Sequence, residues 1–154
     1  MKTSVENTNV ANAVSEQLNQ LLADYQIYYQ NLRTLHWYAQ GRTFFALHGK
    51  FEEYYNEASE VVDELAERIL MLGGKPTHSF AQYLQASRLK ETEAISDGTT
   101  AVNVVLANSE QLLNAVKETF NVAGDAGDEG TLALLSGLIG STEKRIWMLK
   151  SFLQ

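Results

Sequence analysis

The 154-residue sequence contains no cysteine, which excludes a disulfide framework and any metal site built on thiolates. It contains a single proline, and this scarcity favours long helices without interruptions. No apolar run approaches the ~20 residues that a membrane-spanning helix needs, and no hydrophobic leader follows the first methionine. Together these absences predict a cytoplasmic protein without a membrane partner.

Basic residues are scarce as well. Lys and Arg number 12 against 19 Asp and Glu, so the net charge is -7 at pH 7, with a pI near 4.9. This balance argues against a general basic surface for nucleic acid. It is compatible with attraction of metal cations and equally with simple solubility. The apolar content of 45% and the length suit one folded domain, residues 1–154.

Four segments carry the apolar period of amphipathic helices. They run from about 9 to 39, from 43 to 72, from 99 or 100 to 124, and from 128 to the C-terminal region. Thr99 or Thr100 is expected to cap the third helix. Basic residues late in the fourth helix suit its dipole, namely Lys144, Arg145 and Lys150.

The connections between these helices are uneven in length. The one from 73 to 98 is long, and inside it Phe80, Tyr83 and Leu84 have the spacing of a small helix. Four long helices with one long connection between the second and third predict an all-α fold. The arrangement matches a ferritin-like four-helix bundle with a short extra helix in the crossover, although the period alone also allows other four-helix bundles.

Two of the three histidines, His36 and His48, lie twelve residues apart on either side of a Gly-Arg turn. The second helix is rich in acids, and two i, i+4 pairs share a helix face. One pair is His48 with Glu52, and the other is Asp63 with Glu67. Imidazole and carboxylate groups are suitable ligands for iron or zinc, so these residues are candidate metal ligands.

The spacing limits how these ligands combine. His48 and Asp63 are about 22 Å apart on a straight helix, although only about 60° apart around it. Two copies of the helix, packed antiparallel around a two-fold axis near residues 56–58, would bring His48 beside Asp63 and Glu67 of the other copy. His36 would fold back to complete the histidine half. The chain has no Glu-x-x-His motif, which argues against an intrachain di-iron centre.

Four stretches of the chain resemble the Dps family, the mini-ferritins named for DNA protection in starved cells. They are NLRTLHW, GRTFFALHGKFEEYY, DELAERILMLGGKP and KRIWMLKSFL. The resemblance covers nearly the whole chain and includes the spacing His-x11-His-x14-Asp-x3-Glu. It implies a hollow homododecamer that oxidises Fe(II), preferably with hydrogen peroxide, at sites between subunits, and that stores the Fe(III) product as mineral.

The resemblance also implies roles for single residues. Glu52 falls where the family often has an aspartate that helps to hold a second iron, and here the side chain is one methylene longer. Trp37 follows the first histidine, where the family has an aromatic near the site that absorbs stray oxidising equivalents. The alternative for Trp37 is a core or interface aromatic. The catalytic metal ligands implied are His36 and His48 from one subunit, and Asp63 and Glu67 from its partner.

Further acids have implied roles away from the histidines. Glu53 and Glu57 are candidates for mineral nucleation on the inner wall of the shell, or are simply solvated. Asp125, Asp128 and Glu129 fall where the family has pores for iron entry. Cap and dipole chemistry is the other interpretation of Asp128 and Glu129, and the two are compatible.

Relatives that bind DNA often use a mobile tail rich in Lys and Arg, whereas the first ten residues here contain one lysine and one glutamate. With the net charge of -7, we expect direct DNA binding to be weak or absent. Three alternatives to the ferroxidase stay open. They are a DNA-condensing nucleoid protein with little ferroxidase activity, a plain helical oligomer with structural histidines, and a shell that holds zinc.

Overall fold

The computed structural model describes residues 4–154, without the side chains of Glu6 and Asn7. Within this range the chain forms five helices and no strand, which confirms the all-α prediction. The helices are α1 (Ser4–Tyr38), α2 (Phe44–Met71), α3 (Phe80–Ala86), α4 (Gly98–Asp125) and α5 (Glu129–Phe152). Met1 to Thr3, part of the N-terminal stretch expected not to bind DNA, lie outside the described residues.

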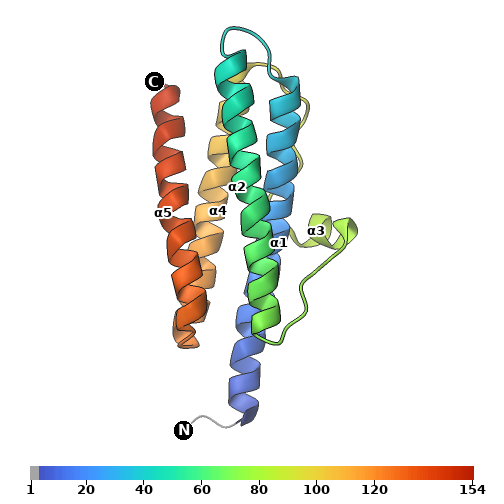
Figure 1. Ribbon diagram of the computed structural model, residues 1–154, viewed down its shortest axis with the longest axis vertical. Coiled ribbons are helices and arrows are strands. Elements are labelled where there is room, and N and C mark those ends of the chain that lie inside the picture. The colour runs from blue at the N-terminus through green and yellow to red at the C-terminus, as the bar shows by residue number, and fades with distance from the viewer. Residues whose placement is uncertain (1–3) are drawn as a thin grey trace.

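The four long helices form a bundle of two antiparallel pairs (Figure 1). Helix α1 packs against α2, α4 packs against α5, and α1 also contacts α4. Because α2 and α4 run in the same direction, their connection must travel the length of the bundle. It carries the short helix α3, which packs on α1, as the crossover pattern predicts.

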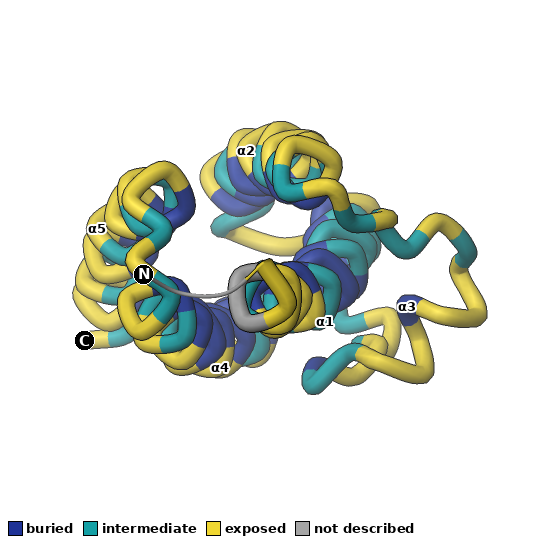
Figure 2. Tube along the Cα trace, turned by 90° about the horizontal axis from the view of Figure 1, so that it is seen from below, coloured by how far each residue is buried: buried dark blue, intermediate teal, exposed yellow. Residues whose placement is uncertain are grey.

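The core lies between the long helices, and Figure 2 shows their buried residues turned toward one another. On α4 the apolar period of the sequence, which includes Leu113 and Phe120, differs slightly from the buried side. Leu112 and Thr119 are fully buried, while Leu113 and Phe120 are only half-buried. On α1 the apolar residues that follow one another at steps of four and three are all buried, namely Val14, Leu18, Leu21, Tyr25, Tyr28, Leu32 and Leu35.

The helix starts correct two expectations. Helix α1 begins at Ser4, earlier than predicted, and its first core residue is Val14, so the apolar period carries no signal for its first turns. Asp97 caps α4 in place of Thr99 or Thr100, and its carboxylate accepts hydrogen bonds from the backbone N–H (2.9 Å) and hydroxyl (2.6 Å) of Thr100.

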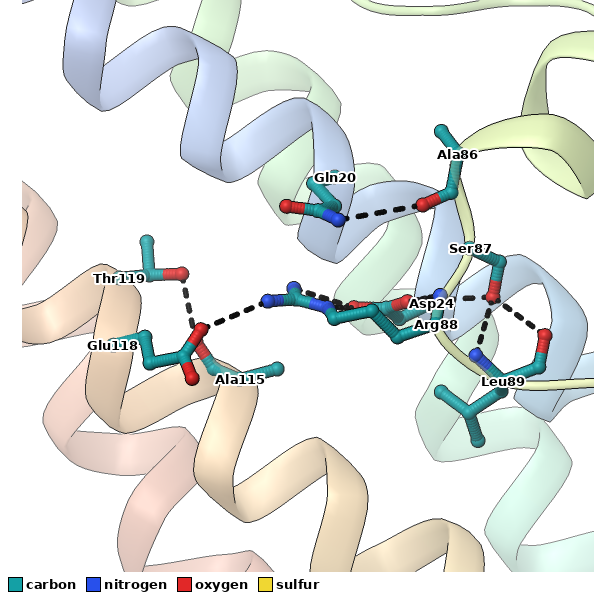
Figure 3. Close-up of polar contacts among 9 residues, drawn as sticks. All are labelled: Gln20, Asp24, Ala86, Ser87, Arg88, Leu89, Ala115, Glu118 and Thr119. Atoms are coloured by element: carbon teal, nitrogen blue, oxygen red, sulfur yellow. Dashed lines mark hydrogen bonds and ion pairs between the residues drawn. The ribbon is translucent and has the colours of Figure 1, made fainter.

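A buried ion pair holds the crossover against the bundle (Figure 3). Asp24 of α1 is fully buried and accepts from the backbone N–H of Arg88 at 2.6 Å, and from Nε and Nη2 of that arginine at 2.9 and 2.6 Å. Arg88 also donates to Glu118 of α4 at 3.1 Å. The crossover is therefore fixed to α1 and α4, and the acidic outer face of α2 stays uncovered.

Candidate metal centre

The structure brings His36 and His48 into contact at one end of the bundle. His36 lies in the last turn of α1, and His48 lies in the second turn of α2. The connection turns at Gly41, whose φ of 91° is a backbone conformation that glycine adopts without strain. The two imidazole rings stack with their centroids 3.8 Å apart and their planes 16° apart.

Each histidine is held by the backbone of the other. Nδ1 of His36 lies 2.6 Å from the carbonyl oxygen of His48, and Nδ1 of His48 lies 2.9 Å from the carbonyl oxygen of His36. A carbonyl oxygen only accepts, so both Nδ1 atoms carry the proton. In the neutral rings each Nε2 then keeps its lone pair, which is the state that a metal ligand requires. We name this pair the histidine clasp.

Aromatic side chains fix the rings of the histidine clasp. Phe44 stacks on His48 with centroids 4.8 Å apart, and Tyr55 meets His36 edge-on at 5.4 Å. The hydroxyl of Tyr55 donates to Oε1 of Glu52 at 3.3 Å, which holds that carboxylate one turn beyond His48. Sequence reasoning missed Phe44 and Tyr55, because the spacing of ligands carries no signal for the rings packed around them.

Trp37 lies beside the histidine clasp but points away from the core. It is 55% exposed, and the guanidinium carbon of Arg33 lies 4.8 Å from its ring. The interpretation of Trp37 as a core aromatic is therefore wrong within one chain. An interface residue and an oxidisable residue near the site both stay predictions.

The carboxylate half of the predicted site lies far along α2. Asp63 and Glu67 are both exposed, and α2 is a continuous helix between them and His48, so the separation of about 22 Å holds. Among residues 4–154 of one chain, no three His, Asp or Glu side chains gather closely enough to hold a metal ion. The four ligands together therefore stay a prediction that requires a second subunit.

The acids of α2 divide between two faces. At about 100° per residue, Glu52 and Asp63 lie within about 60° of His48 around the helix, and Glu67 lies about 100° from it. Glu53 and Glu57 lie farther round, on the side that borders α5. Partial burial raises the pKa of Glu57, although the positive charge of Arg145 opposes the rise. The predicted nucleation residues and the predicted metal ligands are thus separate groups of acids.

Asp128, one of the three acids in the predicted pore, has a defined structural role. It caps α5, and its carboxylate accepts from the backbone N–H of Thr131 at 3.1 Å and from the hydroxyl of that residue at 2.6 Å. Arg68 of α2 donates to it at 2.8 Å. The other two acids, Asp125 and Glu129, are exposed. The cap interpretation is confirmed for Asp128, and the pore stays a prediction.

The Asp128 cap predicts a stability that depends on pH. Burial tends to raise the pKa of Asp128, but the Thr131 hydrogen bonds and the Arg68 charge outweigh burial and lower it below 3.8. A carboxyl with a lowered folded-state pKa stabilises the fold above its ordinary pKa, and this contribution disappears as the pH falls through the lowered value. We expect Asp128→Ala to cost about 1–2 kcal/mol at pH 7.

The measurement is thermal unfolding of wild type and Asp128→Ala from pH 7 to pH 2.5. The difference in melting temperature should narrow as the pH falls below about 4. The control is Asp125→Ala, which removes an exposed neighbouring acid and should change little at any pH. A difference that stayed constant down to pH 2.5 would rule out the charged cap as its source.

Arg145 was expected to act on the dipole of α5, and this expectation is wrong. The side chain is only 7% exposed, and its Nε donates to the hydroxyl of Ser109 at 3.0 Å. Its guanidinium carbon lies 5.1 Å from the ring of Tyr28 and 5.8 Å from that of Tyr54. A signal was present in the sequence, because the spacing of four and three through Leu138, Thr142, Arg145 and Leu149 places the arginine on the core stripe.

The four-helix bundle with its long crossover defines a ferritin-like protein, and residues 15–154 match the family model described as a ferritin-like domain. The Dps protein of Vibrio cholerae O1, described as a member of a broad superfamily of ferritin-like diiron-carboxylate proteins, has a similar crystal structure. Its TM-score is 0.94 at 43% identity, covering 96% of this chain and 92% of that one. The chain belongs to the Dps family.

Other relatives agree with this assignment. A Dps crystal structure from Bacillus brevis gives a TM-score of 0.92 at 36% identity, with each chain fully covered. DNA protection during starvation protein 2 of Bacillus anthracis is 39% identical over 140 residues, which are 91% of this chain and 96% of that protein. Within residues 4–154, no helix is long and apolar enough to cross a bilayer.

Proposed function

We propose that this protein is a ferroxidase that stores iron and detoxifies it. Two Fe(II) ions and one hydrogen peroxide, with two protons, give two Fe(III) ions and two water molecules. The observation that carries the proposal is the histidine clasp, whose reciprocal Nδ1 hydrogen bonds leave both Nε2 atoms as ligands. Family membership supports it, because the Vibrio cholerae relative is described as ferritin-like and diiron-carboxylate.

The site is completed by a second subunit in this proposal. His36 and His48 of one subunit face Asp63 and Glu67 of the partner, and Glu52 helps to hold a second iron. Imidazole nitrogens bind Fe(II), while carboxylate oxygens, as hard ligands, stabilise the Fe(III) product. Zinc suits the same ligands and is the substitute to expect.

The surface of α2 supports a contact with a second helix beside the predicted axis. A shallow hollow in the C-terminal half of α2 is lined mainly by small and acidic residues, among them Ser59, Asp63 and Ala66. Small side chains allow a second helix to approach closely. Large apolar side chains are also exposed on the single chain, including Trp37, Phe45, Phe80, Met71 and Trp147. Exposed apolar surface of this kind marks contacts with other subunits, in keeping with the proposed dodecamer.

The remaining acids fit the storage role in the same proposal. Glu53 and Glu57 face the interior of the shell and start the mineral. Asp125 and Glu129, with Asp128, line the entry pore and concentrate cations by the field of clustered negative charge. The protein acts in the cytoplasm, where Fe(II) and peroxide would otherwise meet and form hydroxyl radical.

The experiment that tests the proposal is anaerobic loading with Fe(II), followed by oxidation with hydrogen peroxide or with air. Ferric absorbance and peroxide consumption are measured together. We expect rapid oxidation by peroxide and slower oxidation by air. About two irons should be oxidised per peroxide, because each Fe(II) gives one electron and each peroxide takes two. Oxidation no faster than in buffer would refute the ferroxidase.

The second candidate function is DNA condensation, which the names of several relatives suggest. The net charge of -7 opposes it, because a shell of such subunits repels phosphate. We expect no tight complex in a gel-shift assay at low salt and neutral pH. A retarded band at low protein concentration would favour DNA condensation over our expectation.

A further inference from the structure

Helices α2 and α5 leave a cleft of about 390 Å³ between them. One wall carries an acidic stripe of α2, in which residues follow at intervals of four, three and four. The facing wall of α5 carries two basic residues and the hydroxyl of Ser141. The charged residues that line the cleft are Glu53, Glu57, Glu60, Glu64, Lys144 and Arg145.

Arg145 is the unusual member of this group. This residue is only 7% exposed. Its Nη2 atom is enclosed and has no hydrogen-bond partner among the described residues. None of the ion pairs formed by the described residues includes Arg145. The charge of Arg145 acts on Glu57, a carboxylate of the same cleft, but the two side chains form no hydrogen bond or ion pair. An oxyanion that accepted hydrogen bonds from the guanidinium would therefore stabilise this buried arginine.

The two walls together define the chemistry of the ligand. A lone anion would be repelled by the four glutamates, and a lone cation would leave Nη2 of Arg145 without a hydrogen-bond acceptor. An oxyanion bound to a highly charged metal ion satisfies both walls. Carboxylates are hard ligands for such an ion, and guanidinium forms strong, directional hydrogen bonds to phosphate oxygens.

We propose that the α2–α5 cleft binds a phosphate-class oxyanion together with a trivalent metal ion. Arg145 and Lys144 hold the oxyanion, while Glu53 and Glu57 hold the ion. Both ligands enter as ions, and no electron is transferred in this binding. The physiological ion would be the Fe(III) that the proposed ferroxidase produces, so this inference rests on the proposed function. Binding itself does not require the oxidation.

The test uses Ga(III), a redox-inert ion of the same charge as Fe(III), supplied as its nitrilotriacetate complex. The assembled protein is incubated with Ga(III) and radiolabelled inorganic phosphate, centrifuged, desalted and counted. We expect retained phosphate only when Ga(III) is present. We expect Glu57→Gln and Lys144→Gln each to reduce retention about tenfold, the value of one charge-assisted hydrogen bond.

The matched control for Lys144→Gln is Lys117→Gln, which removes the same charge from the exposed surface of α4 and should retain phosphate like wild type. Arg145→Lys tests the buried position with its charge kept, and should retain less phosphate because the ammonium loses the forked geometry. Circular dichroism and gel filtration verify that each variant folds and assembles.

Either of two results would overturn the proposal. One is equal retention with and without Ga(III), and the other is equal retention by Lys144→Gln and Lys117→Gln. Ga(III) is not oxidised, so the phosphate retained in this test does not depend on whether the protein is a ferroxidase. A positive result with no ferroxidase activity would retain the cleft as a binding site and remove only its link to iron oxidation.

Discussion

His48→Ala is expected to reduce the rate of peroxide-driven Fe(II) oxidation by at least about a hundredfold. Loss of a residue that only hydrogen-bonds to a metal ligand already reduces activity by up to about a hundredfold, and His48 is itself a proposed ligand. The substitution deletes one imidazole ligand and also the Nδ1 donor that holds the carbonyl of His36. Stopped-flow ferric absorbance after anaerobic loading measures the effect. His78→Ala is the matched control, because this exposed histidine precedes α3 far along the sequence and should leave the rate unchanged.

Mixing two inactive variants distinguishes a shared site from an intrachain one. Asp63→Asn with Glu67→Gln should also be inactive, since it removes the carboxylate half. In a two-fold pair of one His48→Ala subunit and one carboxylate variant, one site carries both defects and the other is intact. Random coassembly from unfolded subunits should therefore restore about a quarter of the wild-type activity. An intrachain site would recover none, and the two-subunit assignment would then be wrong.

Asp24→Ala is expected to lower the free energy of unfolding by about 3 kcal/mol. This is the lower end of the range for breaking a buried ion pair, because Arg88 keeps partial access to water. Asp24 binds both the side chain and the backbone N–H of Arg88, so its loss also releases the crossover from α1. The melting temperature should fall by roughly 6–12 °C in a chain of this size. Calorimetry at one fixed protein concentration measures this change.

The control for this prediction is Glu118→Ala, which removes the other partner of Arg88. Glu118 is 67% exposed, so the pair contributes less than about 1 kcal/mol. If the two variants had equal melting temperatures, the buried carboxylate would not be what holds the crossover.

The apolar period predicted the helices well, because burial on one side is what the period records. It placed α2 within one residue at each end and identified α3 from three residues. Helix ends were less predictable where several polar side chains could each cap the helix. Asp97 caps α4 because its carboxylate reaches Thr100, and a sequence with several candidate caps does not reveal which one reaches.

The candidate site was likewise predictable only in part. Spacing predicted that His36 and His48 would meet and that Asp63 would lie too far away for the same ion. Spacing did not predict the reciprocal hydrogen bonds, which depend on the path of the turn at Gly41. The burial of Arg145 could be inferred from the stripe that it shares with Leu138 and Leu149, but no local pattern records its partners, the hydroxyl of Ser109 and two tyrosine rings.

The histidine clasp forms within one subunit, and this has a thermodynamic consequence for the proposed site. A lone subunit offers an ion the two imidazole nitrogens and Glu52, whereas a pair of subunits adds the carboxylates of Asp63 and Glu67. Iron then binds the pair more tightly than the single subunit, and by linkage it must strengthen pairing by the same factor. Iron in this design is an effector of quaternary structure as well as a substrate, so the apparent dissociation constant of the dimer falls as the free Fe(II) concentration rises.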